Sequence, residues 1–303
     1  MSSRTTYDEV AYPSNPLSQA HPSLLAALGR LHGIDCPSPK RCRYLEVGCG
    51  TGRHLIGLAA RYPDSEFLGL DYAALPIETA TQRTKDLGLK NLRFLEADIR
   101  HLPDEVGAEW DFLVAHGVFS WVPEEARLGI LQAARDRLNP NGLAYISYNA
   151  FPGGRIRQII WDLLRYETER MPDPQDKIRR SREVLNWMVK ATEENPDTYR
   201  RILAEEVERS IHHKDEELLF HDDLSPDNQP YHIAGFLELA GRYGLKYLCE
   251  ADFHEGNPLA FAAEAREALD ALVGDDRVRK EMWMDFARCR RFRQTLLARD
   301  TVE

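Results

Sequence analysis

The chain has 303 residues, of which 43% are hydrophobic and 29% are charged, a composition typical of an ordinary globular protein. No run approaches the roughly 20 apolar residues of a membrane helix, and the chain does not start with the apolar core of a signal peptide. The expected location is therefore cytoplasmic, without membrane insertion. The net charge of −10 disfavours a broad phosphate-neutralising surface, so we expect no nucleic-acid partner.

The cysteines show neither a zinc-type spacing nor a disulfide framework. Their number is odd, which argues against complete pairing, and none of them form the short pairs that metal sites use. We therefore expect free thiols and no metal. The residues are Cys36, Cys42, Cys49, Cys249 and Cys289.

The first half of the chain predicts an α/β domain. Residues 1–42 form an irregular leader with a short helical segment, and we expect this leader to cover the functional site. Residues 43–154 alternate between strand and helix, as a parallel sheet requires, with a loop expected over 139–142. The fold class is therefore α/β, a doubly wound Rossmann-like sheet. Its expected strands are 43–47, 66–71, 92–95, 110–115 and 143–148.

A glycine-rich loop follows the first expected strand. Gly48, Gly50 and Gly52 are separated by single residues, and Asp71 ends the next strand nineteen residues after the last glycine. Glycines let the backbone turn sharply and approach a ligand, and an acid at the tip of the second strand can bind two ribose hydroxyls. The pattern therefore predicts a nucleotide-type cofactor at the first two strands.

The glycine spacing argues against a dinucleotide. In the dinucleotide fingerprint, Gly-x-Gly-x-x-Gly, the third glycine lets helix and strand pack over a pyrophosphate. Here the glycines are closer together and Glu46 precedes them, which suits a ligand without phosphate that carries a positive amino group. S-adenosylmethionine fits this description, with S-adenosylhomocysteine as the product. The loop resembles the first motif of class I methyltransferases.

Asp98, just past the third strand, is the next expected anchor. Its carboxylate can accept a hydrogen bond from an adenine amino group, and Ile99 can pack on the ring face. The alternative is a surface acid at a strand end, but the glycine loop and Asp71 favour the functional interpretation. We assign the cofactor site to Glu46, Gly48, Cys49, Gly50, Gly52, Asp71, Tyr72, Asp98, Ile99 and His116.

His116 follows the fourth expected strand, beside the place where the reacting methyl group lies in class I methyltransferases. It could contact the methionine moiety or take up a proton, although a lone histidine is more often a structural hydrogen-bonding residue. Trp121 could line a substrate pocket or pack in the core. The candidate substrate-pocket residues are Tyr12, Trp121, Tyr148, Asn149 and Asp222.

The second half of the chain differs in character. Residues 155–230 are expected to form a helical insertion that interrupts the sheet domain. Residues 231–263 return to the sheet with one helix and one strand. Residues 264–303 are expected to be C-terminal helices, with the arginines between 288 and 299 on a solvated helix face rather than in a nucleic-acid patch.

Motifs along nearly the whole chain are similar to one bacterial subfamily of class I methyltransferases, which carries a methyltransferase regulatory domain after the catalytic core. Its members include protein-lysine methyltransferases that act on bacterial outer-membrane proteins. Many members look longer, so we expect this chain to be a truncated or a naturally short member. The similar segments are 12–22, 45–52, 116–123, 147–153, 221–231, 244–251 and 290–297.

The resemblance implies methyl transfer from a sulfonium by in-line displacement, in which the protein supplies proximity and alignment. The expected acceptor is a nucleophile, either a protein lysine amine that must first lose a proton or a small molecule. We expect the helical insertion to cover the site. The candidate catalytic residues are His116, His221 and Tyr231, although the last two could instead cap the helix that starts near residue 231.

Two other functions stay open on the sequence alone. A non-catalytic regulator would bind the cofactor with the same fold and lack turnover. A nucleotide-linked oxidoreductase would bind a nicotinamide dinucleotide and ignore S-adenosylhomocysteine. The sequence does not indicate an oligomeric state.

Overall fold

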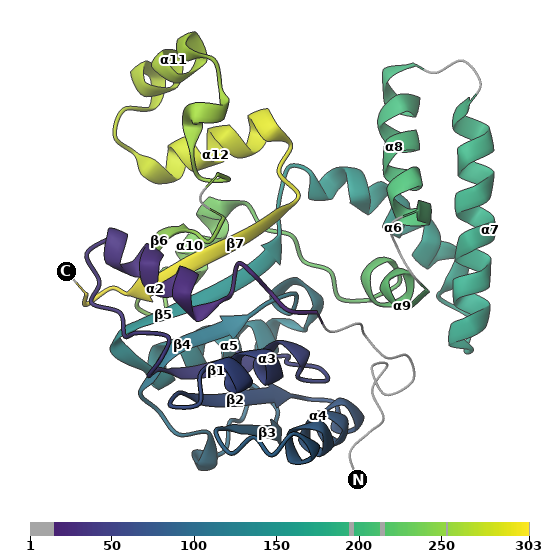
Figure 1. Ribbon diagram of the computed structural model, residues 1–303. Coiled ribbons are helices and arrows are strands. Elements are labelled where there is room, and N and C mark those ends of the chain that lie inside the picture. The colour runs from purple at the N-terminus through teal and green to yellow at the C-terminus, as the bar shows by residue number, and fades with distance from the viewer. Residues whose placement is uncertain (1–14, 194–196, 213–215, 253, 303) are drawn as a thin grey trace.

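The computed structural model describes residues 15–193, 197–212, 216–252 and 254–302. Its seven-stranded sheet has the order β3-β2-β1-β4-β5-β7-β6 (Figure 1). β7 runs antiparallel to both of its neighbours, and the remaining pairs are parallel. This sheet confirms the predicted α/β class. The strands are β1 (Arg43–Val47), β2 (Glu66–Asp71), β3 (Leu92–Glu96), β4 (Trp110–Ala115), β5 (Leu138–Asn149), β6 (Leu245–Glu250) and β7 (Phe292–Arg299).

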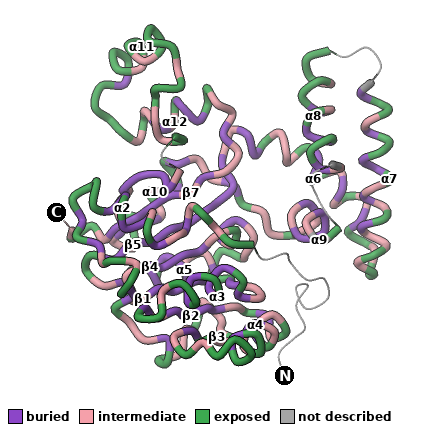
Figure 2. The backbone as a smooth tube through the Cα atoms, viewed as in Figure 1, coloured by how far each residue is buried: buried purple, intermediate pink, exposed green. Residues whose placement is uncertain are grey.

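Helices cover both faces of the sheet. Strand residues alternate between two apolar cores, so that Tyr44 and Phe112 contribute to one core while Leu45 and Leu113 contribute to the other. Helices α2, α3 and α4 add to the first core, and α5 and α10 add to the second. The strands are accordingly buried, as Figure 2 shows. These helices are α2 (Pro22–Leu31), α3 (Arg53–Arg61), α4 (Ala74–Asp86), α5 (Glu124–Arg137) and α10 (Ile233–Gly241).

Strand β5 begins earlier than the sequence predicts. Residues 139–142 were expected to form a loop, but β5 starts at Leu138, directly after α5. Leu138 pairs with Trp110, and the register then shifts along β4. The Asn139 amide also donates a hydrogen bond to Asp111 on β4. Pairing with β4 therefore overrides the turn that the local residues favour.

The helices between β5 and α10 form a block beside the sheet (Figure 1). They pack around an apolar core of their own, which includes Leu164, Leu185 and Val207. Within the described ranges, no helix is both long and apolar enough to cross a membrane. The elements of this helical block are α6 (Gly154–Thr168), α7 (Pro174–Glu193), α8 (Thr198–His212), α9 (Glu216–Leu218) and a π-helical turn, η3 (Leu219–Asp223).

The C-terminal segment is only partly helical, which corrects the prediction for residues 264–303. Helices α11 (Ala263–Val273) and α12 (Arg277–Arg288) are followed by β7, which lies between β5 and β6. The arginines near the end are not on a solvated helix face as expected. Arg290 is 4% exposed and Arg293 is 1% exposed. The local sequence could not reveal this, because their partners lie elsewhere in the chain.

Arg293 pairs with three buried carboxylates. Its guanidinium donates hydrogen bonds to Glu250 on β6 (2.6 Å) and to Glu281 on α12 (2.8 Å). It also donates to both oxygens of Asp285 on α12, at 2.8 and 2.9 Å. A buried charge is costly unless it is paired and hydrogen-bonded, so these contacts explain how an arginine can occupy an interior strand.

Replacing Arg293 with methionine should lower the free energy of unfolding by about 3–5 kcal/mol, because three carboxylates would lose their shared buried partner. The matched control is Arg242→Met, since Arg242 is an exposed arginine that pairs with Glu238 on the protein surface. This control should cost at most about 1 kcal/mol. Chemical unfolding of both variants at neutral pH measures the difference. Equal losses in the two variants would contradict the structural role of Arg293.

Candidate active site

The glycine loop between β1 and α3 needs glycine for two reasons. Gly48 and Gly52 have φ angles of 73° and 72°, in the left-handed region that other residues rarely adopt. A Cβ atom at Gly48 would lie 2.3 Å from Val118 Cγ2, and one at Gly52 would lie 2.3 Å from the Phe94 ring. The loop is therefore held close to the segment after β4 and to β3, and its backbone is left open to a ligand.

Asp71, at the end of β2, fastens this loop. The backbone N–H of Gly50 donates to Asp71 Oδ2 at 2.8 Å, and the N–H of Ala73 donates to Oδ1 at 2.9 Å. These two bonds fix the orientation of the carboxylate at the end of β2, beside the glycine loop. Tyr72, the next residue, is half exposed. Cys49 is buried in the loop, and burial raises the pKa of its thiol well above the usual value.

Glu46 is a buried acid beside the loop. Its side chain is on β1 and the residue is 5% exposed, yet its Oε2 atom has no hydrogen-bond partner in the described part of the protein. Burial, and secondly the charge of Asp71, raises the pKa of Glu46 to about 8. An unpartnered buried carboxylate needs a donor or a cation. The amino group of S-adenosylmethionine supplies both, so this residue fits the cofactor.

Asp98, the third acid of the series, lies beyond the end of β3 and is paired within the protein. Arg100 donates to its two oxygens at 2.9, 2.9 and 2.6 Å. The hydrogen bonds from Arg100 lower the pKa of Asp98. Ile99 is partly buried against the core. The acid therefore occupies the expected place, but an adenine amino group would have to share it with Arg100.

His116, immediately after β4, is the first member of a hydrogen-bonded chain. Its Nδ1 atom lies 2.8 Å from the Tyr145 hydroxyl, which donates to Gln294 Oε1 at 2.7 Å. With the tyrosine proton directed to Gln294, His116 Nδ1 carries a hydrogen and Nε2 is an unprotonated acceptor. Burial lowers the pKa of His116 to about 4, so the ring is neutral at physiological pH.

Sequence reasoning missed Tyr145 and Gln294. Tyr145 lies in an apolar strand and resembles a core residue. Gln294 was assigned to a helix, and only its true place on β7, paired with β5, brings it beneath His116. No local signal could have identified the contact, because it joins residues 149 positions apart.

The return loop before α10 crosses the ends of β4 and β5. Ser120 lies in the 3-10 turn η2 (Phe119–Trp121), and its carbonyl accepts a hydrogen bond from the Gln229 N–H at 2.8 Å, while its hydroxyl accepts one from the Asn149 N–H at 2.8 Å. The Asn149 amide also donates to Asn228 Oδ1 at 3.1 Å. Trp121 packs edge-on against Trp161 of the helical block, with 6.0 Å between ring centroids. The structure thus brings Trp121 and Asn149 together at this edge of the sheet.

Tyr148 differs from its expected role in a substrate pocket. It is 1% exposed and stacks on Phe236 of α10, with 4.1 Å between ring centroids. It is therefore a core residue in this structure. Tyr231 packs edge-on against Tyr148 and is only half buried. Burial raises the pKa of Tyr231, with Arg127 opposing the shift.

His221 and Asp222 lie in the π-helical turn η3 of the helical block. His221 is 5% exposed and packs edge-on against Phe220, and Asp222 is partly buried. Residues of η3 contact α6 and α7. Tyr12, the remaining pocket candidate, lies outside the described residues. Among the described residues, no cluster of three or more His, Cys, Asp or Glu could hold a metal ion, and the five cysteines are unpaired.

Glu46 should make stability depend on pH. Because its folded pKa of about 8 exceeds the usual 4.5, the folded state holds this proton more tightly, and stability falls as pH rises towards 8. His54 and His116 have the opposite effect, which fades as pH rises above 6.5, so we choose the window pH 7–8, in which Glu46 dominates. We expect a loss of roughly 1 kcal/mol across it, measured by chemical unfolding without cofactor.

The matched variants are Glu46→Gln, which removes the titrating group, and Glu105→Gln at an exposed position. The first should flatten the pH dependence in this window, and the second should leave it unchanged. A wild-type slope that survives in Glu46→Gln would show that another group is responsible.

Two family models match the chain. Residues 45–142 match a model described as a methyltransferase domain, and residues 215–299 match one described as "Predicted methyltransferase regulatory domain". The second match begins within the helical block, at α9 and η3, and continues through α10, β6, α11, α12 and β7. Helices α6, α7 and α8 lie between the two matched segments.

Curated and solved relatives agree with these matches. The uncharacterised protein RP028 of Rickettsia prowazekii is 32% identical over 245 residues, covering 81% of this chain and 97% of that protein. The uncharacterised protein RP789 of the same organism is 33% identical over 300 residues, covering 98% of this chain and 53% of that protein.

The structure of PKMT2 from Rickettsia typhi in complex with AdoHcy has a TM-score of 0.87 at 29% identity, covering 96% of this chain and 55% of that one. This chain thus spans about half the length of RP789 and of PKMT2. Both family models, the shared sheet and the near-complete match to RP028 lead to one conclusion. The chain belongs to the class I S-adenosylmethionine-dependent methyltransferases that carry a methyltransferase regulatory domain.

Proposed function

We propose that this protein binds S-adenosylmethionine and transfers its methyl group to a nucleophile, with a protein lysine amine as the acceptor. The observation that carries the proposal is the unpartnered Glu46 carboxylate, buried next to a glycine loop that Asp71 fastens. S-adenosylmethionine, when bound, supplies a methyl group activated by a positively charged sulfur. The complex of the related PKMT2 with AdoHcy supports the same choice of ligand.

The acids at the ends of the first three strands would have different tasks. Glu46 would pair with the amino group of the ligand, which favours its ionised form. Asp71 would accept hydrogen bonds from the ribose hydroxyls. Asp98 would accept from the adenine amino group, and Ile99 would pack on the ring. The left-handed turns at Gly48 and Gly52 let the loop pack closely on Val118 and Phe94, and this packing fixes the backbone that would approach the ligand.

The acceptor amine must be neutral when it attacks, and a free lysine has a pKa near ~10.4. His116 is a poor general base for this step, because its pKa of about 4 lies far below physiological pH. We infer that His116 Nε2 instead accepts a hydrogen bond and orients the acceptor. Deprotonation would then follow from desolvation of the amine, since a dry pocket favours the neutral form. Alignment itself can contribute up to about 7–11 kcal/mol in ideal cases.

The helical block is proposed to cover the acceptor side of the site. Support comes from the contact between Trp161 and Trp121 and from the hydrogen bonds of residues 228 and 229 to the ends of β4 and β5. The leader, of which residues 15–42 are described, packs on the same domain: the Leu17 N–H donates to His54, and the Ala20 carbonyl accepts from the Tyr44 hydroxyl.

Isothermal titration with S-adenosylmethionine and S-adenosylhomocysteine tests the cofactor. Micromolar binding is expected, and Asp71→Ala should abolish it, because that change removes both the ribose acceptor and the bond that fastens Gly50. Asp64→Ala, at an exposed acid in the loop before β2, is the control and should bind normally. A folded wild-type protein that binds neither ligand would end the proposal. Binding would justify a screen of lysine-containing proteins and small molecules with a labelled methyl donor.

Once an acceptor is known, the variant His116→Gln distinguishes the two roles of His116, orientation of the acceptor and general-base catalysis. Loss of one hydrogen bond should lower kcat/KM by roughly 3- to 10-fold, equivalent to about 0.5–1.5 kcal/mol. Loss of a general base would lower it by about 10²–10⁴. The pH profile should also keep its shape between pH 6 and 8, because His116 does not titrate there. A large loss with a changed profile would make His116 the base.

Tyr231→Phe should be measured in the same assays, because Tyr231 is a candidate to contact the substrate. Unchanged cofactor affinity together with unchanged turnover would remove its hydroxyl from the site.

A further inference from the structure

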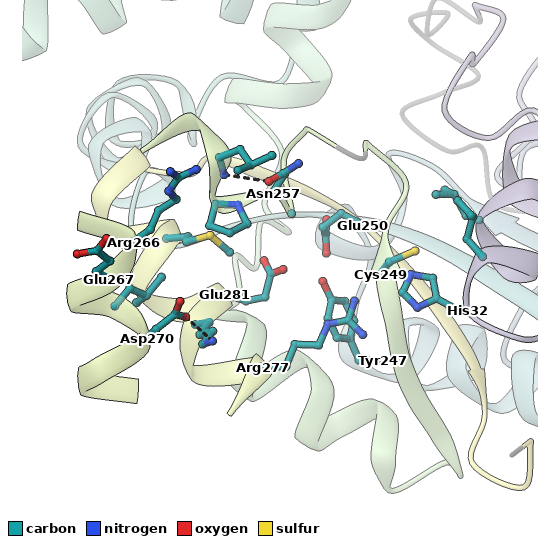
Figure 3. Close-up of a pocket in the computed structure, with 18 of the residues that line it drawn as sticks. His32, Tyr247, Cys249, Glu250, Asn257, Arg266, Glu267, Asp270, Arg277 and Glu281 are labelled. Atoms are coloured by element: carbon teal, nitrogen blue, oxygen red, sulfur yellow. Dashed lines mark hydrogen bonds and ion pairs between the residues drawn. The ribbon is translucent and has the colours of Figure 1, made fainter. Parts of the chain in front are cut away.

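A cavity of about 780 Å³ lies between α2, β6, the turn around residue 257, α11 and α12. Figure 3 shows Arg266, Glu267 and Asp270 of α11 on one side of it and His32 of α2 on the other. Apart from α2, all of its walls fall within the residues that match the regulatory model. None of its lining residues belongs to the candidate active site, so this regulatory cavity is a separate feature.

Glu281 of α12 reaches the cavity with an unpartnered oxygen. The residue is 3% exposed, and its Oε2 atom accepts from Arg293 at 2.8 Å. No hydrogen bond of Oε1 occurs within the described part of the chain. Gly256 faces this oxygen: a Cβ atom in place of the glycine hydrogen would lie 3.4 Å from Oε1. Glu281 is thus almost fully buried and faces Gly256, which has no side chain. This arrangement leaves room for a hydrogen-bond donor at Oε1.

Tyr247 of β6 adds a second unsatisfied group to the same cavity. Its hydroxyl is buried and has no hydrogen-bond partner among the described residues. Arg277 lies over the face of its ring, 4.7 Å from the centroid, and so does not bond the hydroxyl. A buried hydroxyl without a partner is unfavourable, and a ligand with a polar hydrogen-bonding group would remove this penalty.

The charges beneath the cavity do not balance. Arg293 is shared by Glu250, Glu281 and Asp285, and Arg290 pairs only with Asp285 in this group. Three carboxylates therefore face two guanidinium groups in the interior. Burial raises the pKa of Glu281, as expected for an acid with too little positive charge around it. A ligand with one positive charge would complete the group.

The remaining walls define the rest of the ligand. Three basic side chains also border the cavity: Arg266 of α11, Lys280, which is paired with Asp270 at 2.5 Å, and Arg277, which lies over the Tyr247 ring. The apolar part of the lining includes Leu28 of α2, Leu269 of α11 and Met284 of α12. These surfaces suit a short methylene chain.

We propose that the regulatory cavity binds an alkylammonium group, whose nitrogen donates to Glu281 Oε1 and to the Tyr247 hydroxyl while its methylenes pack on the apolar walls. The group can come from a free aliphatic amine or from a lysine side chain, since both present the same chemistry. The proposal concerns a second site and holds whether or not the methyltransferase function does.

Isothermal titration of the full chain with n-pentylamine tests the proposal, with 1-pentanol as the neutral counterpart. Pentylamine should bind and pentanol should bind at least tenfold more weakly, because only the amine supplies the missing charge. Nα-acetyl-lysine methylamide distinguishes the sources: equal or tighter binding than pentylamine points to a lysine side chain, and weaker binding points to a free amine. Absence of binding by both amines would overturn the proposal.

Variants locate the site. Glu281→Gln should weaken pentylamine binding at least tenfold and Tyr247→Phe about threefold, while Glu264→Gln, at an exposed acid of α11 outside the cavity, should have no effect. Arg277→Gln should not weaken binding, because Arg277 is not a ligand. Tyr247→Phe removes only an oxygen, so it tests the site even if Glu281→Gln proves unstable in a thermal melt.

Saturating S-adenosylhomocysteine should leave pentylamine binding unchanged, as should His116→Gln. Loss of amine binding under either condition would place the amine in the acceptor site and overturn the proposal. Binding that survives both Glu281→Gln and Tyr247→Phe would do the same.

Discussion

The buried guanidinium of Arg293 holds the C-terminal half of the structure in place. It is on β7 and binds β6 through Glu250 and α12 through Glu281 and Asp285. These elements are far apart in the sequence, and each would otherwise bury a charge without compensation. Because β7 is fixed in this way, its neighbour Gln294 lies beneath Tyr145 and His116. β7 therefore contributes to both sites: Gln294 supports the active-site histidine through Tyr145, and Arg293 binds Glu281 at the regulatory cavity.

The three acids at the carboxyl ends of β1, β2 and β3 look equivalent in the sequence, but the structure gives each a different electrostatic state. Asp71 is satisfied by backbone N–H groups and Asp98 by Arg100. Glu46 is buried with an unpartnered oxygen, and its pKa of about 8 means that its charge changes near neutrality. Proton release from Glu46 should therefore accompany binding of a ligand that carries a positive amino group.

The sequence predicted the features that depend on local geometry. The spacing of Gly48, Gly50 and Gly52 identified the left-handed turns, and Asp71 could be placed because parallel strands end at a common edge. The predictions were wrong where distant partners decide the structure. Arg293 of β7 looks solvated in the local sequence, but Glu250 and Glu281 pair with it in the interior. β5 begins at residue 138 because Leu138 pairs with Trp110 of β4 before the register shifts. Tyr148 was assigned to a pocket, but α10 covers it.

The position of β7 has a consequence for how the chain reaches this structure during synthesis. In the described sheet, β6 pairs only with β7, yet residues 245–250 leave the ribosome well before residues 292–299. β6 and its residue Glu250 therefore remain unpaired while α11 and α12 leave the ribosome. β6, one of the two edge strands of the finished sheet, therefore joins the sheet only after a delay. Its pairing with β7 closes a long loop, and such contacts form slowly. A nascent chain at this stage exposes an unpaired strand edge, the kind of surface that chaperones protect from aggregation.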